Sequence, residues 1–201
     1  LIVAFASYLM SKIAAVTGAR GTIGKLVVKS LLDIGWHVRV LTRTNHFINS
    51  SKVTVVSSDI NDEHGLRILL KGVNAIFHCA AELKDEKIMY STNVEGTRNL
   101  VKLLASTNVS YFCYLSSAGV IGPTSIPFVT EKTPCNPNNL YEKTKYEAEM
   151  LVSRAKLDMN ICILRPTNVV SHSKPGVLLL PINNSWSDII KVYIIPSFSF
   201  V

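Results

Sequence analysis

Three glycines between an apolar strand and an amphipathic helix constrain this chain more than any other feature. They lie in the sequence TGARGTIG at positions 17–24, after a strand expected at 13–17 and before a helix expected at 23–34. A tight turn and a close approach of backbone to a ligand both need residues without Cβ. The helix start also offers free N–H groups and the positive end of its dipole. We therefore predict a pyrophosphate-binding turn made of Gly18, Arg20, Gly21, Thr22, Ile23 and Gly24.

Strands and helices alternate along the chain, which indicates the α/β class. Six short apolar segments read as strands, and the stretches between most of them have helical spacing. We predict a Rossmann-like doubly wound parallel sheet with helices on both faces. The strands are expected at 13–17, 38–41, 53–57, 75–79, 111–116 and 161–164, and the helices at 23–34, 61–71, 84–106 and 140–155.

The pattern weakens after position 170, and this sets the expected domain organisation. Residues 10–170 should form the NAD(P)-binding Rossmann domain, with Met10 as the expected natural start. Residues 171–201 should form a partial or truncated C-terminal segment, which the family resemblance given below assigns to a substrate-binding lobe that is otherwise largely missing.

Charge, hydropathy and cysteine usage exclude several partners. The net charge is +7, but the basic residues are scattered, so we expect no nucleic-acid partner. The apolar run at 1–9 is too short to cross a bilayer, so no membrane association is expected. The four cysteines form no C-x-x-C pair and accompany no histidine cluster, which predicts no metal site and a reduced, cytoplasmic protein.

The end of the second expected strand bears on the choice of dinucleotide. A carboxylate there would bind the ribose hydroxyls of NAD(H). This chain instead has Leu41, Thr42 and Arg43 at that point. Because a guanidinium pairs well with a 2′-phosphate, NADP(H) is the favoured cofactor, with NAD(H) as the alternative.

A tyrosine and a lysine one helical turn apart indicate acid–base chemistry. Tyr141 and Lys145 share one face of a helix, and a nearby ammonium should lower the pKa of the phenol. Ser117 follows the fifth expected strand, and ligands of parallel sheets bind beyond the carboxyl ends of the strands. We predict Ser117, Tyr141 and Lys145 as the catalytic residues.

These motifs resemble the extended short-chain dehydrogenase/reductase family over about residues 12–170. Beside the turn and the Tyr-Lys pair, the matching segments lie at 58–60, 78–81, 93–97, 114–118 and 164–169. The resemblance implies that Lys145 also holds the nicotinamide ribose, and that His78 is structural. It further implies contacts to the cofactor from Asp59, Ile60, Cys79, Ala80, Ala81, Asn93, Pro166 and Thr167.

By this resemblance, the chain is expected to be an NAD(P)-dependent oxidoreductase or epimerase. Hydride transfer would occur at a hydroxyl or carbonyl carbon of a nucleotide sugar or a related small molecule. Ala118 and Gly119 stand where the family's dehydratases carry Asp-Glu, which argues against dehydration. The alternative is a non-catalytic or truncated dinucleotide-binding protein. A homodimer through the helices at 84–106 and 140–155 is also expected.

Overall fold

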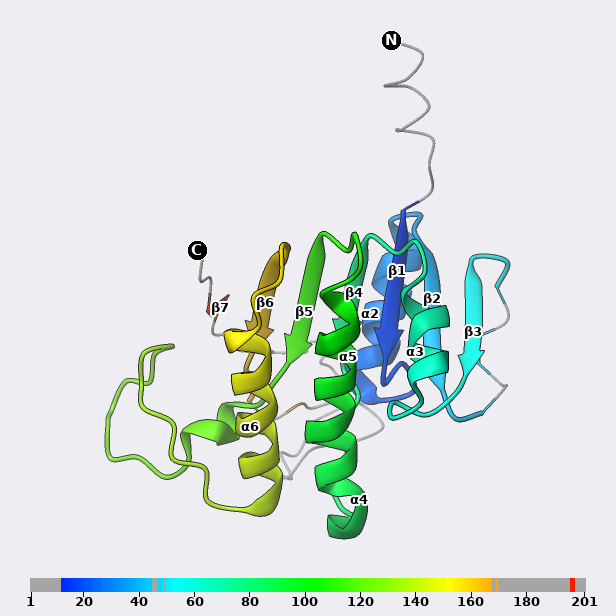
Figure 1. Ribbon diagram of the computed structural model, residues 1–201. Coiled ribbons are helices and arrows are strands. Elements are labelled where there is room, and N and C mark those ends of the chain that lie inside the picture. The colour runs from blue at the N-terminus through cyan, green and yellow to red at the C-terminus, as the bar shows by residue number, and fades with distance from the viewer. Residues whose placement is uncertain (1–11, 45–46, 49, 168, 170–195, 198–201) are drawn as a thin grey trace, which may run out of the picture.

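The computed structural model describes residues 12–44, 47–48, 50–167, 169 and 196–197 (Figure 1). The expected start at Met10 and almost all of the expected segment 171–201 lie outside these residues. Six strands run parallel in the order β3-β2-β1-β4-β5-β6, which confirms the doubly wound prediction. They are β1 (Ile13–Thr17), β2 (His37–Thr42), β3 (Val53–Ser57), β4 (Ala75–His78), β5 (Tyr111–Leu115) and β6 (Asn160–Leu164).

A seventh strand, β7 (Pro196–Ser197), pairs antiparallel with β6. The expected sheet was wholly parallel, so β7 is a departure from the prediction. Two residues are too few for a period in the sequence to mark a strand, and its direction depends on how the chain returns to the sheet.

The helices divide between the two faces of the sheet because the strand order reverses beside β1. The α2 helix (Thr22–Asp33) packs on one face, and α3 (Glu63–Leu70), α5 (Gly96–Leu104) and α6 (Leu140–Arg154) pack on the other (Figure 1). Right-handed crossovers in opposite directions along a sheet place their helices on opposite faces. Two hydrophobic clusters follow from this division, one on each face.

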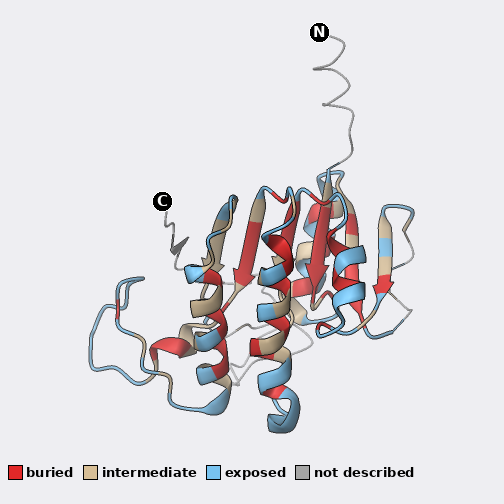
Figure 2. Cartoon of the chain, viewed as in Figure 1, coloured by how far each residue is buried: buried red, intermediate tan, exposed pale blue. Residues whose placement is uncertain are grey.

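The middle of the sheet is covered on both faces, as Figure 2 shows by the buried residues along β1, β4 and β5. Ala14 and Val16 of β1 belong to the cluster beneath α2, whereas Ala15 belongs to the cluster beneath the other helices. Burial on both sides explains why β1 is a continuous apolar run rather than an alternating one.

The long helix predicted at 84–106 is wrong in its detail. The structure has α4 (Glu86–Tyr90), a π-helical segment η1 (Ser91–Glu95) and then α5. A π segment accommodates one extra residue in a turn, which changes the direction of the side chains there. Asn93, in η1, is buried as a result.

Two smaller differences concern helix ends. The α3 helix begins at Glu63 rather than at the expected position 61, and the side chain of Asp62 caps it by accepting a hydrogen bond from His64 N. After β5, a 3₁₀ helix η2 (Ala118–Ile121) precedes the long loop to α6. Ser117 caps η2 by accepting the Gly119 N–H at 3.1 Å.

Candidate active site

The glycine-rich turn is pressed against the end of β4. Gly18 has a φ of +65°, and a Cβ there would lie 2.5 Å from Ala80 N and from the carbonyl carbon of Cys79. A Cβ on Gly24 would lie 2.2 Å from the carbonyl oxygen of Gly18. Only glycine fits these two positions, as the turn predicted from sequence requires.

The first turn of α2 is open to an anion. Its N-cap, Gly21, offers no side-chain acceptor to the helix N–H groups, and the first turn contains no acidic residue. The Gly21 N–H is itself used, because it donates to Gly18 O at 2.9 Å. A twelve-residue helix with an uncapped N-terminus behind a glycine cradle fits a pyrophosphate.

Two arginines flank the expected ribose position at the end of β2. Arg20 Nη1 donates to the hydroxyl of Thr44, and Thr44 N donates to Thr42 Oγ1 at 3.3 Å. Arg20 and Arg43 are both exposed. The turn and the end of β2 are thus joined, and this corner of the site is positively charged.

His78 is buried in a chain of hydrogen bonds that fixes its tautomer. Thr97 Oγ1 donates to Asn93 O, so it accepts from His78 Nε2 at 2.9 Å. The Nδ1 atom of His78 therefore accepts from the Thr17 hydroxyl at 2.6 Å. Burial and the charge of Lys145 lower the pKa of His78 to about 3, so the ring is neutral at physiological pH. These contacts fix the ring between β1 and α5, and the structural role that the resemblance implied for His78 stays a prediction.

Asn93 joins three segments around the site. Its Oδ1 accepts from Glu82 N at 2.7 Å, and its Nδ2 donates to Glu82 O and to Thr144 Oγ1, each at 3.0 Å. The side chain therefore holds the backbone that follows β4, where Ala80 and Ala81 lie, against α6 next to Lys145. These bonds position the neighbouring backbone, and the cofactor contact that the resemblance implies for Asn93 stays a prediction.

The other expected cofactor contacts are spread over the same edge of the sheet. Ile60 is buried and packs against Gly96, whereas Asp59 is exposed and accepts the Asn61 N–H at 2.9 Å. Cys79 is half-buried at the end of β4. Pro166 is buried and Thr167 exposed beyond β6, and Pro166 O accepts from Ala118 N at 2.9 Å.

Of the three expected catalytic residues, Ser117 and Tyr141 lie close together, whereas the ammonium of Lys145 points to the backbone of β5. Ser117 lies close enough to Tyr141 for its side chain to lower the pKa of the phenol. Lys145 is buried, and its Nζ donates to Leu115 O at 2.6 Å. Burial lowers the pKa of Lys145 to about 7, against the opposing influence of Cys79 and Glu149.

The expected lowering of the Tyr141 pKa by Lys145 is wrong for this arrangement. Burial raises the pKa of Tyr141, and the side chain of Ser117 opposes that rise. The lysine ammonium is engaged with a carbonyl of β5 instead of the phenol. Helical spacing placed the two residues on one face, but it gave no information on desolvation or on the direction of a flexible lysine.

A buried ion pair beneath the site was not predicted from the sequence. Arg165 binds Glu149 through two nitrogens, with Nε at 3.1 Å from Oε2, and Ser116 donates to the same carboxylate. Glu149 follows Lys145 by four residues on α6, and Arg165 directly follows β6. The pair therefore joins the helix that carries Tyr141 and Lys145 to the ends of β5 and β6. The i+4 spacing of Glu149 from Lys145 was the available signal in the sequence.

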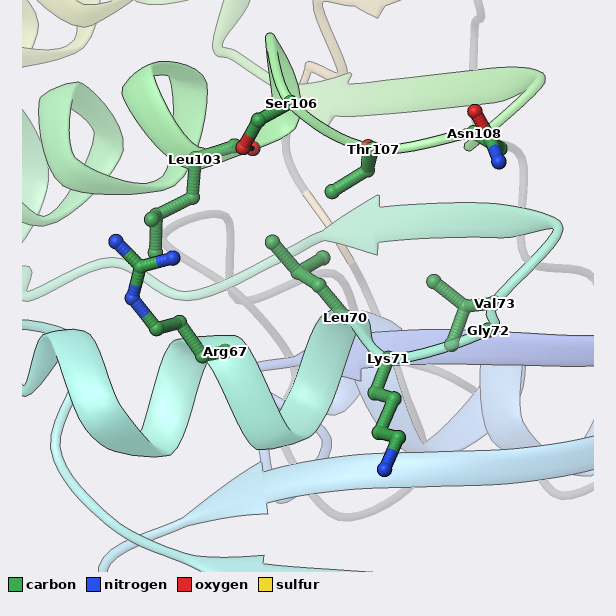
Figure 3. Close-up of a pocket in the computed structure, with 9 residues that line it drawn as sticks. All are labelled: Arg67, Leu70, Lys71, Gly72, Val73, Leu103, Ser106, Thr107 and Asn108. Carbon is green, nitrogen blue, oxygen red and sulfur yellow. Dashed lines mark hydrogen bonds between the residues drawn. The ribbon is translucent and has the colours of Figure 1, made fainter.

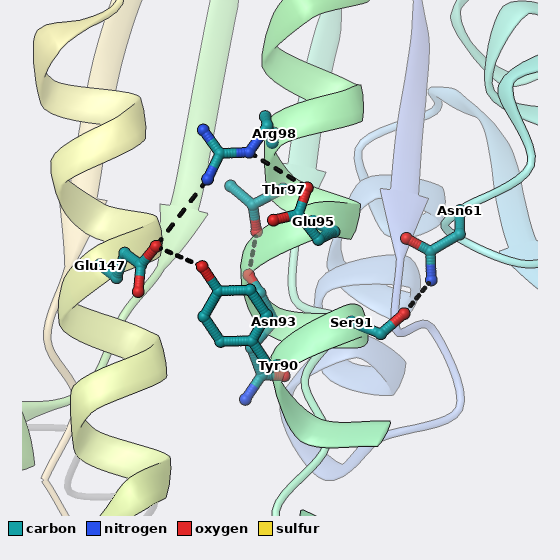
Figure 4. A network of polar contacts seen from close by, with 8 residues as sticks. All are labelled: Asn61, Tyr90, Ser91, Asn93, Glu95, Thr97, Arg98 and Glu147. Carbon is teal, nitrogen blue, oxygen red and sulfur yellow. Dashed lines mark hydrogen bonds and ion pairs between the residues drawn. The ribbon is translucent and has the colours of Figure 1, made fainter. Parts of the chain in front are cut away.

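Two further polar features lie away from this site. A pocket between α3 and α5, before β4 and β5, opens at the opposite edge of the sheet (Figure 3), and no predicted site residue lines it. On the outside of α5 and α6, Glu147 accepts from Tyr90 OH at 2.7 Å and lies 3.8 Å from Arg98 (Figure 4). Within the described part of the chain, no group of His, Cys, Asp or Glu could hold a metal, and no helix could cross a membrane.

Comparison with known proteins identifies relatives of this arrangement. Residues 14–179 match the model of the NAD dependent epimerase/dehydratase family. A sterol-4-alpha-carboxylate 3-dehydrogenase (decarboxylating) of Dictyostelium discoideum is 32% identical over 72% of this chain and 48% of its own length. The chain spans about half the length of the curated relatives it matches.

Solved structures agree with the fold, and some of them contain a bound dinucleotide. A short-chain dehydrogenase/reductase superfamily protein from Agrobacterium tumefaciens, with bound NAD, is 30% identical with a TM-score of 0.69, over 76% of this chain and 48% of that one. MoeE5 in complex with UDP-glucose and NAD is 25% identical with a TM-score of 0.67, over 76% of this chain and 53% of that one.

Substitution of Gly18 should cost more stability than substitution of another glycine with positive φ. Gly35 has a φ of +88° but open space around it, so Gly35→Ala carries the conformational penalty alone, about 1–2 kcal/mol. Gly18→Ala adds a backbone collision, worth about 1–3 kcal/mol more. Urea unfolding of both variants measures the difference. Equal losses would show that the turn does not press on β4.

Breaking the buried pair should destabilise the protein far more than breaking an exposed one. Glu149→Gln leaves Arg165 buried without its countercharge, which costs about 3–5 kcal/mol. Glu147→Gln on the same helix removes an exposed contact, and should change the free energy of unfolding by less than about 1 kcal/mol. Chemical denaturation of the two variants provides the test, and similar values would rule out the assigned role of Glu149.

Proposed function

The chain belongs to the NAD-dependent epimerase/dehydratase family, and from that premise we propose that it transfers hydride between a nicotinamide dinucleotide and a carbon bearing a hydroxyl or carbonyl. One observation carries the proposal. The glycine cradle that precedes α2 and the Ser117–Tyr141 pair lie at the same edge of the sheet, beyond the carboxyl ends of β1 and β5. Phosphate binding and acid–base chemistry can therefore serve one ligand.

In this mechanism the residues of the chain bind, orient and move a proton. When bound, the dinucleotide supplies or accepts the hydride. The N–H groups at the start of α2 would hold its pyrophosphate, and Lys145 would hold the ribose on the nicotinamide side. Ser117 would orient the substrate oxygen, and Tyr141 would exchange a proton with that oxygen.

The state of Tyr141 favours reduction over oxidation. Because burial raises its pKa, Tyr141 is a neutral phenol at physiological pH and can donate its proton to a carbonyl oxygen. A carbonyl carbon would gain the hydride while its oxygen takes the phenolic proton, which completes an alcohol. Oxidation of an alcohol, or the double hydride step of an epimerase, would first need the phenolate.

NADP(H) is the proposed cofactor. The end of β2 offers Thr42 and Arg43 where an NAD-binding site has a carboxylate, and Arg20 adds a second cation nearby. The solved relatives named above bind NAD, so the proposed preference would distinguish this chain from them.

The relatives support the substrate classes that we propose. A nucleotide sugar or a related small molecule fits the neighbour that binds UDP-glucose. A second candidate is a hydroxysterol, which the greater identity to the Dictyostelium dehydrogenase supports. A homodimer through the outer faces of α5 and α6 completes the proposal. The alternative is a protein that binds a dinucleotide without turnover.

Cofactor preference can be measured against a matched arginine. Arg43→Gln should weaken NADPH binding about 10–100-fold and leave NADH binding unchanged, because only the 2′-phosphate uses the guanidinium. Arg67→Gln, on the exposed face of α3, should change neither dissociation constant. Titration of cofactor fluorescence gives the values. Tighter NADH than NADPH binding by the unmodified chain would refute the preference.

Tyr141→Phe should lower turnover about 10²–10⁴-fold, since it removes the proton donor, while the cofactor dissociation constant stays the same. Tyr90→Phe provides the control, because Tyr90 is exposed on the outside of the α5–α6 pair. Turnover is followed by absorbance of the reduced cofactor on a panel of nucleotide sugars and hydroxysteroids with their ketones. Cofactor binding without turnover of any compound by the unmodified chain would favour the non-catalytic alternative.

A further inference from the structure

The ammonium group of Lys145 lies over an aromatic ring. Its Nζ is 4.4 Å from the ring centroid of Tyr114, which lies near the carboxyl end of β5. Both side chains are buried, with exposed fractions of 2% for Lys145 and 0% for Tyr114. A cation at this distance from a ring face is attracted by the ring quadrupole, most strongly where water is excluded.

The ring of Tyr114 also packs against a second ring. His78 packs against it with ring centroids 5.5 Å apart, and His78 is itself fixed between Thr17 and Thr97. Lys145 is also fixed, because its Nζ donates to the carbonyl oxygen of Leu115, the next residue along β5. The lysine is thus held by the face of one residue of β5 and the backbone of the next.

The hydroxyl of Tyr114 does not explain why the residue is there. It is buried and makes no hydrogen bond of normal geometry to any described residue, although the Thr97 side chain beside it lowers the pKa of the phenol. The hydroxyl of Thr97, beside it, already donates to Asn93 and accepts from His78. Because a buried polar group without a partner costs free energy, the ring is the useful part of the side chain.

We propose that Tyr114 is a positioning residue whose ring face holds the Lys145 ammonium at the carboxyl end of β5. Its value for catalysis rests on the proposed function, because Lys145 serves catalysis only if the chain binds the dinucleotide. The contact itself does not depend on that function. Tyr114 acts through Lys145 and touches no reacting atom.

The surroundings of Lys145 determine what the ring must do. Cys79, directly after β4, the neutral His78 of β4 and Glu149 of α6 lie near it, and Tyr141 is one turn earlier on α6. Cys79 and Tyr141 are neutral at physiological pH, and Glu149 is already paired with Arg165. Burial lowers the pKa of Lys145 to about 7, so a modest loss of stabilisation would leave the amine mostly uncharged.

The test measures the pKa of Lys145 directly by nuclear magnetic resonance of isotope-labelled lysine side chains, from about pH 5 to about pH 10. The Lys145 signal is assigned by its absence from Lys145→Met. Tyr114→Phe, which keeps the ring, should leave this pKa unchanged. Tyr114→Leu should lower it by about one unit, since it removes the quadrupole. An unchanged pKa in a folded Tyr114→Leu variant would overturn the proposal.

A second series keeps the test decisive if Tyr114→Leu does not fold. Phenylalanine and trifluorophenylalanine introduced at position 114 have nearly the same shape, but fluorination withdraws charge from the ring face. The pKa of Lys145 should be lower in the fluorinated protein. Equal pKa values in the two proteins would overturn the proposal, whatever the leucine variant does.

Cofactor binding separates this inference from the proposed function. The dissociation constant for NADPH should rise in Tyr114→Leu relative to Tyr114→Phe, most clearly near neutral pH, where the charge of Lys145 differs. If the ring changes the pKa of Lys145 but no variant binds a dinucleotide, the proposed function fails and the contact stands. If all variants bind the dinucleotide equally well and the pKa of Lys145 does not change, the proposed role of Tyr114 is refuted and the proposed function stands.

Discussion

The contact between the ends of β1 and β4 is the constraint on which the site depends. Gly18 lies so close to the backbone of Cys79 and Ala80 that no side chain fits between them. Thr17 strengthens the same junction, because its hydroxyl bonds His78 and accepts the Ala80 N–H at 3.3 Å. The strand order reverses between β1 and β4. In a doubly wound sheet, the crevice that binds the ligand forms at this point. The glycine turn can face the residues of β5 and α6 only because this junction is tight.

Burial, more than charge pairing, determines the chemistry of the site. It keeps His78 neutral, brings the pKa of Lys145 down to about 7 and raises that of Tyr141. Glu149 is bound to Arg165 and Ser116, so it holds α6 against the ends of β5 and β6. Its effect on the pKa of Lys145 is smaller than that of burial. A neutral phenol beside a half-charged amine is suited to proton donation, which is why the proposed reaction runs toward reduction.

The sequence predicted the frame of the molecule well because local signals define it. Apolar runs marked all six parallel strands, and the turn at Gly18 was identifiable from its place between a strand and a helix. Ser117 and Tyr141 could be brought together in advance because parallel strands end at a common edge. Their roles, and those of the expected cofactor contacts, remain predictions that cofactor and substrate measurements must test.

What the sequence did not predict depends on contacts between distant segments. The π segment around Asn93 arises because Asn93 must reach Glu82 and Thr144, which helical periodicity does not record. The pairing of Glu149 with Arg165 needs β6 to lie beside β5, and the ring of Tyr114 reads as ordinary core until α6 is placed over it. The pKa of Tyr141 is raised, whereas the sequence predicted that it would be lowered. The reason is the same, because desolvation is a property of the packed site.

The central claim is that the turn before α2 binds a nicotinamide dinucleotide. The most direct measurement is a calorimetric titration of the unmodified chain with NADPH and then with NADH. We expect saturable binding of NADPH, NADH or both, with one dinucleotide per chain. A folded protein that releases no heat and shows no saturation with either would contradict it.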